Sequence, residues 1–432
     1  MAKAKPNTEL CKGCRLCVGA CPKQAIIPLE EVNKKGYQII RVDEEKCIGC
    51  GMCYKTCPDC VFTIAEAKGG YKMSADYVLM KGNEAIAEAA LRAGCRFYAG
   101  YPITPQSEIL EYMSSNMQKY GGTFIQGENE IASMSMIWGA AAAGARCMSS
   151  SSGPGFDLKQ EEISYLSSYN LPCVLVDAMR YGLGDGEITA GQDSYWEAVR
   201  GGGHGDSRQL VYAPASVDEC VQLTYQAFDK AEEYRNVVII LTDGAISQMI
   251  EKCTLPPAKE HDINKFDWTL TGKPLGVKKN KVYNLDHTIG FEAWEKLMRN
   301  KFKTMYENEQ RWEEFQTDDA EIVLVAIGIS SRVCKSAVRQ ARKEGFKLGL
   351  LRPITVWPFP RKAFEKMPKS VEAYVTVEMS MSSQMGEDVL LAMKHQKPFY
   401  SYLTTKYIPK AEDIVNFCKD IKAGKVQQTE VF

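Results

Sequence analysis

The chain has 432 residues, a formal net charge of −1 at pH 7 and 45% hydrophobic residues. Because this near-neutral balance supplies no broad basic field, nucleic acid is not an expected partner. The first residues form no apolar secretion signal, and nowhere do about 18 apolar residues follow one another without a charge. We therefore expect a cytoplasmic protein of two or three domains that does not enter a membrane.

Eight of the 16 cysteines form two groups with the same internal spacing. They read Cys11-x2-Cys14-x2-Cys17-x3-Cys21-Pro22 and Cys47-x2-Cys50-x2-Cys53-x3-Cys57-Pro58. This run is typical of bacterial ferredoxins with two [4Fe–4S] clusters, in which the fourth cysteine of each group binds the other cluster. We expect Cys11, Cys14, Cys17 and Cys57 to hold the first cluster, and Cys47, Cys50, Cys53 and Cys21 to hold the second. Zinc is the alternative, but its sites usually combine two cysteine pairs.

After this module the sequence alternates between short apolar runs and helical patterns. Strands are expected over residues 96–100, 147–150, 173–177 and 237–241, with helices between them over 83–92 and 130–143. This alternation predicts a parallel sheet covered by helices on both faces.

The chain divides into four predicted segments. Residues 1–72 form the two-cluster ferredoxin domain, 73–250 the first α/β domain, 251–318 a charged linker, and 319–432 a second, smaller α/β domain. In the last segment we expect strands over 321–328, 348–351 and 373–377 and a helix over 331–343.

Several short motifs lie in the α/β part of the chain. They are Lys81-Gly-Asn-Glu-Ala85, Tyr101-Pro-Ile-Thr-Pro-Gln-Ser-Glu108, Glu128-Asn-Glu-Ile-Ala132, Ser149-Ser-Ser-Ser-Gly-Pro-Gly155, Gly201-Gly-Gly-His-Gly-Asp206 and Leu351-Arg-Pro-Ile-Thr-Val-Trp-Pro-Phe-Pro360. Taken alone, Thr104 before Pro105 is typical of a helix start, with a capping hydroxyl ahead of a proline. Together, the motifs resemble the α subunit of 2-oxoacid:ferredoxin oxidoreductases over most of residues 77–432. The resemblance is greatest to the branched-chain (3-methyl-2-oxobutanoate) subgroup, with a ferredoxin-like δ subunit fused in front.

The resemblance implies the fold and the cofactors. It predicts a bacterial-type 2[4Fe–4S] ferredoxin module, then an α/β domain of the pyrimidine type found in thiamine diphosphate enzymes, then a transketolase-C-like α/β domain. A separate β subunit would supply the site for the diphosphate and Mg²⁺ together with a further cluster. Consistent with this, Asp185-Gly186 and Asp243-Gly244 lack the continuation that a diphosphate and Mg²⁺ motif requires. A γ subunit and an external acceptor, ferredoxin or another carrier, complete the implied partners.

The same resemblance assigns roles to individual residues. Glu130 matches the glutamate that hydrogen-bonds the pyrimidine N1′ and promotes loss of the thiazolium C2 proton; Glu128 is the alternative register. Thr104 matches a threonine that contacts the substrate, and Arg180 an arginine that binds an anion. Tyr101, Pro102 and Ile103 accompany Thr104 beside the cofactor. The simpler readings are a helix-start glutamate stabilised by the helix dipole and a strand-end arginine in solvent.

The implied reaction is the oxidative decarboxylation of a 2-oxoacid to an acyl-CoA and CO2, with electrons leaving through the clusters. One departure is the acidic loop Tyr181-Gly-Leu-Gly-Asp-Gly-Glu187, where relatives carry a compact Gly-Gly-Pro turn. This departure leaves open an aryl 2-oxoacid substrate of the phenylglyoxylate or indolepyruvate type. A separate alternative is that the α/β body is a docking scaffold for electron transfer without catalytic residues.

Overall fold

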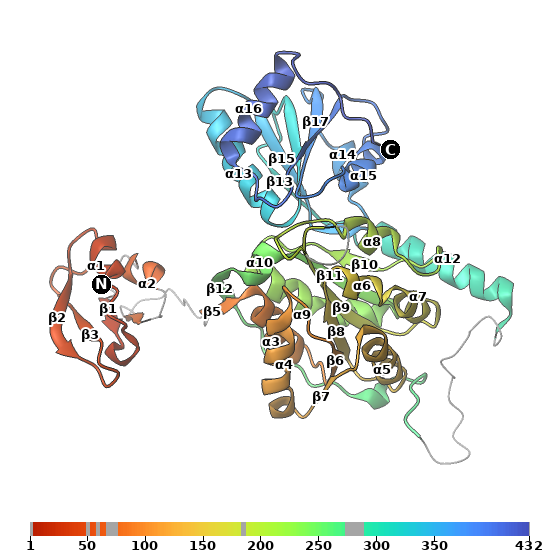
Figure 1. Cartoon of the computed structure of the whole chain (residues 1–432), viewed down its shortest axis with the longest axis horizontal. Helices are drawn as coiled ribbons and strands as arrows, with labels where there is room; N and C mark the ends of the chain where they lie inside the picture. Colours follow the sequence, from red (N-terminus) through yellow and green to blue (C-terminus); the bar gives the residue numbers. More distant parts are fainter. Residues whose placement is uncertain are drawn as a thin grey trace. The chain divides into compact units, whose positions relative to one another are not determined.

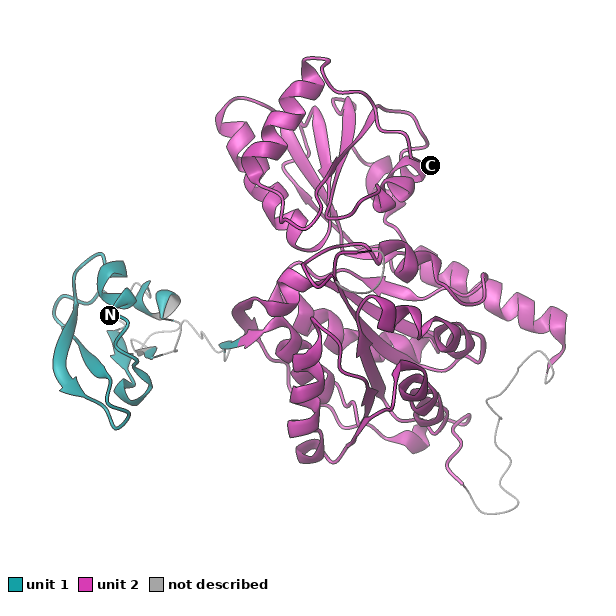
Figure 2. Ribbon diagram, viewed as in Figure 1, with its two compact units in different colours: residues 1–79 teal, residues 80–432 magenta. Residues whose placement is uncertain are grey.

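The computed structural model describes residues 3–48, 52–57, 61–65, 77–182, 187–272 and 289–431. The chain separates into two compact units, Met1–Leu79 and Met80–Phe432 (Figure 2). Cys50 lies outside the described residues, as do residues 183–186 of the acidic loop. None of the described helices combines the length and apolar character that a bilayer span requires.

Unit 1 is built from two hydrogen-bonded strand pairs and two short helices. Its elements are β1 (Lys3–Pro6), η1 (Thr8–Leu10), α1 (Leu16–Ala20), β2 (Ile26–Val32), β3 (Gln38–Val42), α2 (Met52–Thr56) and β4 (Phe62–Ala65). Strand β1 pairs antiparallel with β4, and β2 pairs antiparallel with β3. Its core combines apolar side chains such as Ile26, Ile40 and Phe62 with five of the cysteines.

The first part of unit 2, hereafter the body, contains a seven-stranded sheet. Its elements are β5 (Tyr77–Lys81), α3 (Gly82–Arg92), β6 (Phe97–Gly100), α4 (Ser107–Asn116), η2 (Met117–Tyr120), β7 (Thr123–Gln126), α5 (Glu130–Ala142), β8 (Cys147–Ser151), α6 (Pro154–Asp157), α7 (Gln160–Ser168), β9 (Cys173–Met179), α8 (Tyr195–Arg200), β10 (Leu210–Tyr212), α9 (Val217–Tyr234), β11 (Val237–Asp243), α10 (Gly244–Gln248) and β12 (Ile250–Thr254). The strand order is β16-β10-β11-β9-β8-β6-β7, and all neighbours are parallel except β16.

Helices cover both faces of this sheet, as the sequence predicts (Figure 1). On β9, Val174 and Val176 face a core shared with α3, α4 and α9. Their neighbours Cys173 and Leu175 face the opposite core, which is shared with α5 and α7. Because successive side chains of a strand alternate between faces, a strand buried on both sides is apolar throughout.

The rest of unit 2 forms a C-terminal domain around a five-stranded sheet of order β13-β15-β14-β17-β18. The elements that follow β12 along the chain are η3 (Ile263–Lys265), α12 (Phe291–Asn308), β13 (Trp312–Phe315), β14 (Ile322–Val325), α13 (Gly328–Lys343), β15 (Leu348–Pro353), β16 (Thr355–Trp357), α14 (Arg361–Glu365), β17 (Ala373–Glu378), α15 (Gln384–Ala392), β18 (Phe399–Leu403) and α16 (Ala411–Lys422). Strand β16 leaves this domain and pairs with β10 at the edge of the body sheet.

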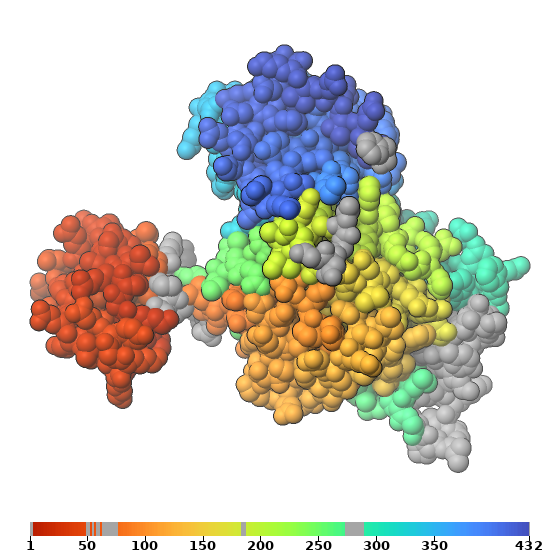
Figure 3. Space-filling model, viewed as in Figure 1, coloured from red at the N-terminus to blue at the C-terminus, as the bar shows by residue number. Residues whose placement is uncertain are grey.

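Buried polar contacts join the C-terminal domain to the body, and the space-filling view shows the two surfaces in contact (Figure 3). The Tyr195 hydroxyl donates to Asp388 Oδ2 at 2.8 Å. The Asp243 carboxylate accepts from the backbone N–H groups of Ile246 at 2.9 Å and of Ile329 at 2.7 Å. Asp243 therefore caps α10 and links both parts.

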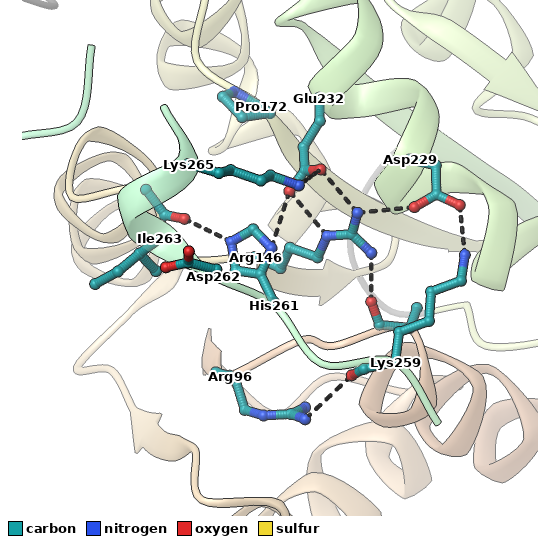
Figure 4. A network of polar contacts seen from close by, with 12 residues as sticks. Arg96, Arg146, Pro172, Asp229, Glu232, Lys259, His261, Asp262, Ile263 and Lys265 are labelled. Carbon is teal, nitrogen blue, oxygen red and sulfur yellow. Dashed lines mark hydrogen bonds and ion pairs between the residues drawn. The ribbon is translucent and has the colours of Figure 1, made fainter. Parts of the chain in front are cut away.

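The segment expected to be a linker contains ordered structure, including α12 and β13. Its residues 259–265 are fixed to the body by a network of charges centred on Arg146 (Figure 4). The Arg146 guanidinium is 7% exposed and donates to Glu232 Oε2 and Asp229 Oδ1, each at 2.7 Å. Glu232 also contacts His261 Nδ1 at 3.3 Å and Lys265 Nζ at 3.0 Å. This network holds the segment against α9.

Candidate functional site

The two cysteine groups occupy equivalent places in unit 1. Cys17 is the second residue of α1 and Cys53 the second residue of α2, while Cys21 and Cys57 each directly follow their helix. The duplication in the sequence is therefore a duplication of structure. Gly13, before the first helix, has φ +69°, a backbone conformation that favours glycine.

Cys17 lies among the other three cysteines expected at the first cluster. Burial, together with the nearby sulfurs of Cys57, Cys14 and Cys11, raises the pKa of its thiol to about 11. Thiolates gathered in this way repel one another unless a metal cluster neutralises them. These four cysteine side chains fit the thiolate ligands of an iron–sulfur cluster. Cys57, which belongs to the second group in the sequence, lies with the first group in the structure.

Three of the cysteines expected at the second cluster line one cavity: Cys21, Cys47 and Cys53. Backbone N–H groups point at two of these sulfurs, from Ala25 to Cys21 at 3.3 Å and from Ala4 to Cys47 at 3.5 Å. Amide donors to cluster-bound sulfur help set the reduction potential. In the described part of the chain, no three side chains converge tightly enough for a single metal ion. A four-iron cluster needs wider spacing, since each cysteine binds a different iron.

In unit 2 the predicted site residues follow four neighbouring parallel strands. Thr104 comes after β6, Glu130 after β7, the Ser152–Gly155 turn after β8 and Arg180 after β9. The carboxyl ends of parallel strands meet at one edge of the sheet. The neighbouring strands β6 and β8 are followed by β7 and β9, which lie on opposite sides of them in the sheet. Such a switch point is where open α/β sheets usually bind ligands.

Thr104 and Arg180 are in direct contact. Arg180 Nη1 donates to the Thr104 backbone oxygen at 3.1 Å, and the Thr104 side chain is exposed. The guanidinium also lies against the glycine turn, because a Cβ atom placed on Gly153 would be 2.8 Å from Arg180 Nε. Although Arg180 is buried to 6% exposure, it lines a cavity of about 290 Å³. It is thus an inward-facing cation and not a strand-end arginine in solvent.

The helix start expected at Thr104 is wrong. Helix α4 begins at Ser107, and Gln106 occupies the position before it. The Gln106 side chain turns inward, donating to the Tyr101 backbone oxygen at 3.0 Å and accepting from Ser150 Oγ at 2.5 Å. These two hydrogen bonds of Gln106 fix the bend of residues 101–106. The Thr104 hydroxyl has no capping role, and Pro102 is exposed beside the half-buried Ile103.

Glu130 begins α5, and its neighbour Asn129 caps the helix by accepting from the Ala132 N–H at 2.8 Å. The Glu130 side chain is only 6% exposed, so it is not the solvent-exposed helix-start residue of the simpler reading. A Cβ atom on Gly155 would lie 2.4 Å from Glu130 Oε1 and 2.4 Å from Ser151 Oγ. Within the described residues the buried Ser151 hydroxyl has no hydrogen-bond partner. A buried carboxylate with an unsatisfied hydroxyl beside it fits a polar heterocycle such as an aminopyrimidine.

Sequence reasoning missed two acidic groups near Arg180. Burial raises the pKa of Asp177 to about 8 and, together with a hydrogen bond to Asp157, raises the pKa of Glu197 to about 10. Glu197, Asp157 and Arg180 line the same cavity. The available signal was the position of Asp177 at the end of the predicted strand over 173–177, whereas Glu197 lies in α8 between the half-buried Trp196 and the buried Ala198. Burial therefore favours the neutral form of both carboxyl groups.

A dicluster ferredoxin module followed by a parallel α/β body defines an iron–sulfur oxidoreductase subunit. A family model described as "Pyruvate flavodoxin/ferredoxin oxidoreductase, thiamine diP-bdg" matches residues 88–315, "Pyruvate:ferredoxin oxidoreductase core domain II" matches 320–407, and "4Fe-4S dicluster domain" matches 10–61.

Relatives agree with these matches. The ketoisovalerate oxidoreductase subunit VorB of Methanothermobacter thermautotrophicus is 45% identical over 317 residues, covering 73% of this chain and 89% of VorB. The 2-oxoglutarate synthase subunit KorA of Archaeoglobus fulgidus is 36% identical over 315 residues, covering 72% and 90%. A solved 2-oxoglutarate:ferredoxin oxidoreductase from Magnetococcus marinus shares the fold, with TM-score 0.68 at 23% identity, covering 82% of this chain and 66% of that one.

The chain belongs to the 2-oxoacid:ferredoxin oxidoreductase family. It is a subunit of an oxidoreductase that acts on 2-oxoacids, with an iron–sulfur protein as acceptor. Its relatives are subunits of multi-subunit enzymes, so other chains complete the enzyme. The predicted family, fold class and cofactor types are confirmed.

Proposed function

We propose that this chain is the α subunit, with a fused two-cluster ferredoxin, of a CoA-dependent branched-chain 2-oxoacid:ferredoxin oxidoreductase. The observation that carries the proposal is that Thr104, Glu130 and Arg180 each follow a parallel strand whose carboxyl end lies at the same edge of the body sheet. Residues 1–72 would serve electron transfer, residues 73–250 the thiamine site, and residues 319–432 the support of that site, with 251–318 joining the two α/β domains.

The cysteines would hold the two clusters, which supply one-electron carriers. Cys11, Cys14, Cys17 and Cys57 would bind the first, and Cys47, Cys50, Cys53 and Cys21 the second. The mutual proximity of the first set and the shared cavity of three of the second set support this division.

Glu130 would hold the pyrimidine N1′ of thiamine diphosphate, with Tyr101, Pro102 and Ile103 beside the cofactor. When bound, thiamine diphosphate supplies a carbanion that attacks the ketone and stabilises charge after CO2 departs. The burial of Glu130 excludes water from its carboxylate and strengthens any hydrogen bond it makes. A β subunit would bind the diphosphate and Mg²⁺, and a γ subunit and an external ferredoxin would complete the complex.

Arg180 and Thr104 would bind the substrate. A 2-oxoacid carries a carboxylate next to a ketone, which suits a guanidinium beside a threonine hydroxyl. Asp157 and Glu197 lie in the same cavity, and because burial raises the pKa of Glu197 to about 10 it does not repel the substrate at pH 7.

The branched-chain substrate is favoured by the ketoisovalerate oxidoreductase subunits among the relatives. A substrate panel on the purified complex checks this choice. We expect the highest kcat/KM with 3-methyl-2-oxobutanoate, and lower values with 2-oxoglutarate, phenylglyoxylate and indolepyruvate. A preference for an aryl acid would transfer the assignment to that subgroup.

The Glu130→Gln complex tests the proposal itself. Glutamine keeps the size of the side chain but cannot become anionic, so CoA-dependent turnover should fall at least about 100-fold. Iron content and thermal stability should match the wild type. Full turnover in this variant with intact clusters would leave the body as a docking scaffold only.

A further inference from the structure

The cavity that contains Arg180 is lined by residues of both α/β domains. The body contributes Trp196 of α8, and the C-terminal domain contributes Met381, Ser382 and Gln384, which follow β17. Trp196 is half-buried, and Met381 is 55% exposed. These two large apolar side chains, hereafter the apolar wall, are therefore open to a ligand that enters the cavity.

Hydrogen bonds to the C-terminal domain fix the position of Trp196. Its indole N–H donates to the Gln384 backbone oxygen at 3.0 Å, and its backbone N–H donates to Gln384 Oε1 at 2.9 Å. The Gln384 side-chain amide in turn donates to the Asp193 backbone oxygen at 2.8 Å. The indole ring is thus held in one orientation between the two domains.

The turn that carries Met381 is held at both ends. At its start, the Met379 backbone N–H donates to Gln192 Oε1 at 3.2 Å, and the Met379 oxygen accepts from the Gln192 N–H at 2.8 Å. At its end, Gln384 is bound to the body as described above. Within the turn, the Ser380 hydroxyl donates to the backbone oxygen two residues later at 2.6 Å. The backbone around Met381 is therefore fixed, whereas its unbranched side chain can adapt to a ligand.

The charged residues of the lining favour a ligand with a single carboxylate. Among the described residues, Arg180 is the only basic side chain that lines this cavity; the other charged residues are Asp157, Asp193 and Glu197. A first carboxylate can bind the guanidinium, but a second would meet only acidic or neutral groups. One cation together with an indole and a thioether fits a monocarboxylate that carries an apolar side chain.

We propose that Met381 is a specificity-determining residue: with Trp196 it forms the apolar surface on which the side chain of an aliphatic 2-oxoacid packs while Arg180 binds the carboxylate. The inference rests on the proposed function and deepens it, because it gives the C-terminal domain a part in the choice of substrate. Met381 acts by packing alone and takes no part in proton or electron transfer.

The test compares Met381→Ala with Leu391→Ala in the purified complex. The measured quantity is the kcat/KM for 3-methyl-2-oxobutanoate divided by that for pyruvate, whose single methyl group reaches the apolar wall less. We expect this ratio to fall about tenfold or more in Met381→Ala. Leu391→Ala removes a 48% exposed side chain from α15 of the same domain and should keep the wild-type ratio. Met381→Leu restores similar volume and should recover most of the selectivity.

A gain of function provides a second measurement that misfolding cannot imitate. Met381→Lys places a cation in the apolar wall, so the kcat/KM for 2-oxoglutarate relative to 3-methyl-2-oxobutanoate should rise about tenfold or more.

The outcomes separate the two proposals. A wild-type ratio in Met381→Ala, equal losses toward both acids, or no relative gain for 2-oxoglutarate in Met381→Lys would refute the role of Met381 and leave the proposed function standing. The proposed function fails separately, through a fully active Glu130→Gln complex.

Discussion

Gly155 controls how closely the Glu130 carboxylate can approach the turn after β8. Because any Cβ atom there would collide with Glu130 Oε1 and Ser151 Oγ, both at 2.4 Å, the position tolerates no side chain without moving the carboxylate. Local sequence patterns could not predict this contact, because it joins the start of α5 to the turn after β8.

Gly155→Ala is therefore expected to reduce turnover at least about tenfold, because Glu130 is displaced from its working position. The matched control is Gly139→Ala in α5, where an added Cβ meets nothing within 4 Å and alanine favours the helix. Steady-state kinetics and thermal melts of the two complexes check the prediction. Equal turnover in both variants would contradict the role given to Gly155.

Arg180 offers a second test at the scale of single residues. Arg180→Lys keeps the positive charge but loses the planar fork that suits a carboxylate. We expect KM for 3-methyl-2-oxobutanoate to rise about tenfold or more, because a charge-assisted hydrogen bond to the substrate is lost. The control is Arg200→Lys. Arg200 pairs with Asp388 at 3.2 Å, and its replacement should leave KM near the wild-type value. An unchanged KM in Arg180→Lys would remove the residue from substrate binding.

At the scale of elements, local periodicity predicted most of the body. Strands β6, β8, β9 and β11 lie where apolar runs predict them, each differing by at most two residues at an end. Two features could not be predicted. Strand β16 joins the sheet of the other domain, and α4 begins at Ser107 because Gln106 bonds to Tyr101 and Ser150. Both depend on contacts between distant parts of the chain.

The Arg146 network fixes residues 259–265 to α9, and its removal should free that segment. Arg146→Met leaves Glu232 and Asp229 without their buried partner and should lower the free energy of unfolding by about 3–5 kcal/mol. Arg299→Met removes only an exposed helical pair with Glu295 and should cost less than about 0.5 kcal/mol. Urea titration measures both. Similar small losses would show that the network is not structural.

The same network has a predicted pH dependence. Burial alone would raise the pKa of Glu232, but hydrogen bonds and charge from Arg146 outweigh it, so the pKa falls below the ordinary 4.5. The stability from this group is therefore full above pH 4.5 and is lost as the pH falls through the lower folded value. Arg146→Met should flatten that part of the stability curve, and an unchanged slope would contradict the assignment.

At the scale of the whole molecule, the chain joins an electron-transfer unit to an α/β unit that, in our proposal, forms one half of a thiamine site. A covalent link keeps the clusters at high effective concentration near their electron source. We expect about eight iron atoms per chain after anaerobic purification, and a fall toward about four in Cys57→Ser. The control is Cys334→Ser, which removes a buried thiol of the C-terminal domain and should leave the iron content unchanged. Zinc in place of iron would contradict the ferredoxin assignment.

The most direct test of the account is freeze-quench electron paramagnetic resonance of the anaerobic complex, mixed with 3-methyl-2-oxobutanoate and CoA. In the wild type we expect reduced [4Fe–4S] signals within one turnover. In Glu130→Gln we expect almost none, although dithionite should reduce the same clusters. Substrate-driven cluster reduction at the wild-type rate in Glu130→Gln would contradict the claim that this chain supplies the catalytic carboxylate.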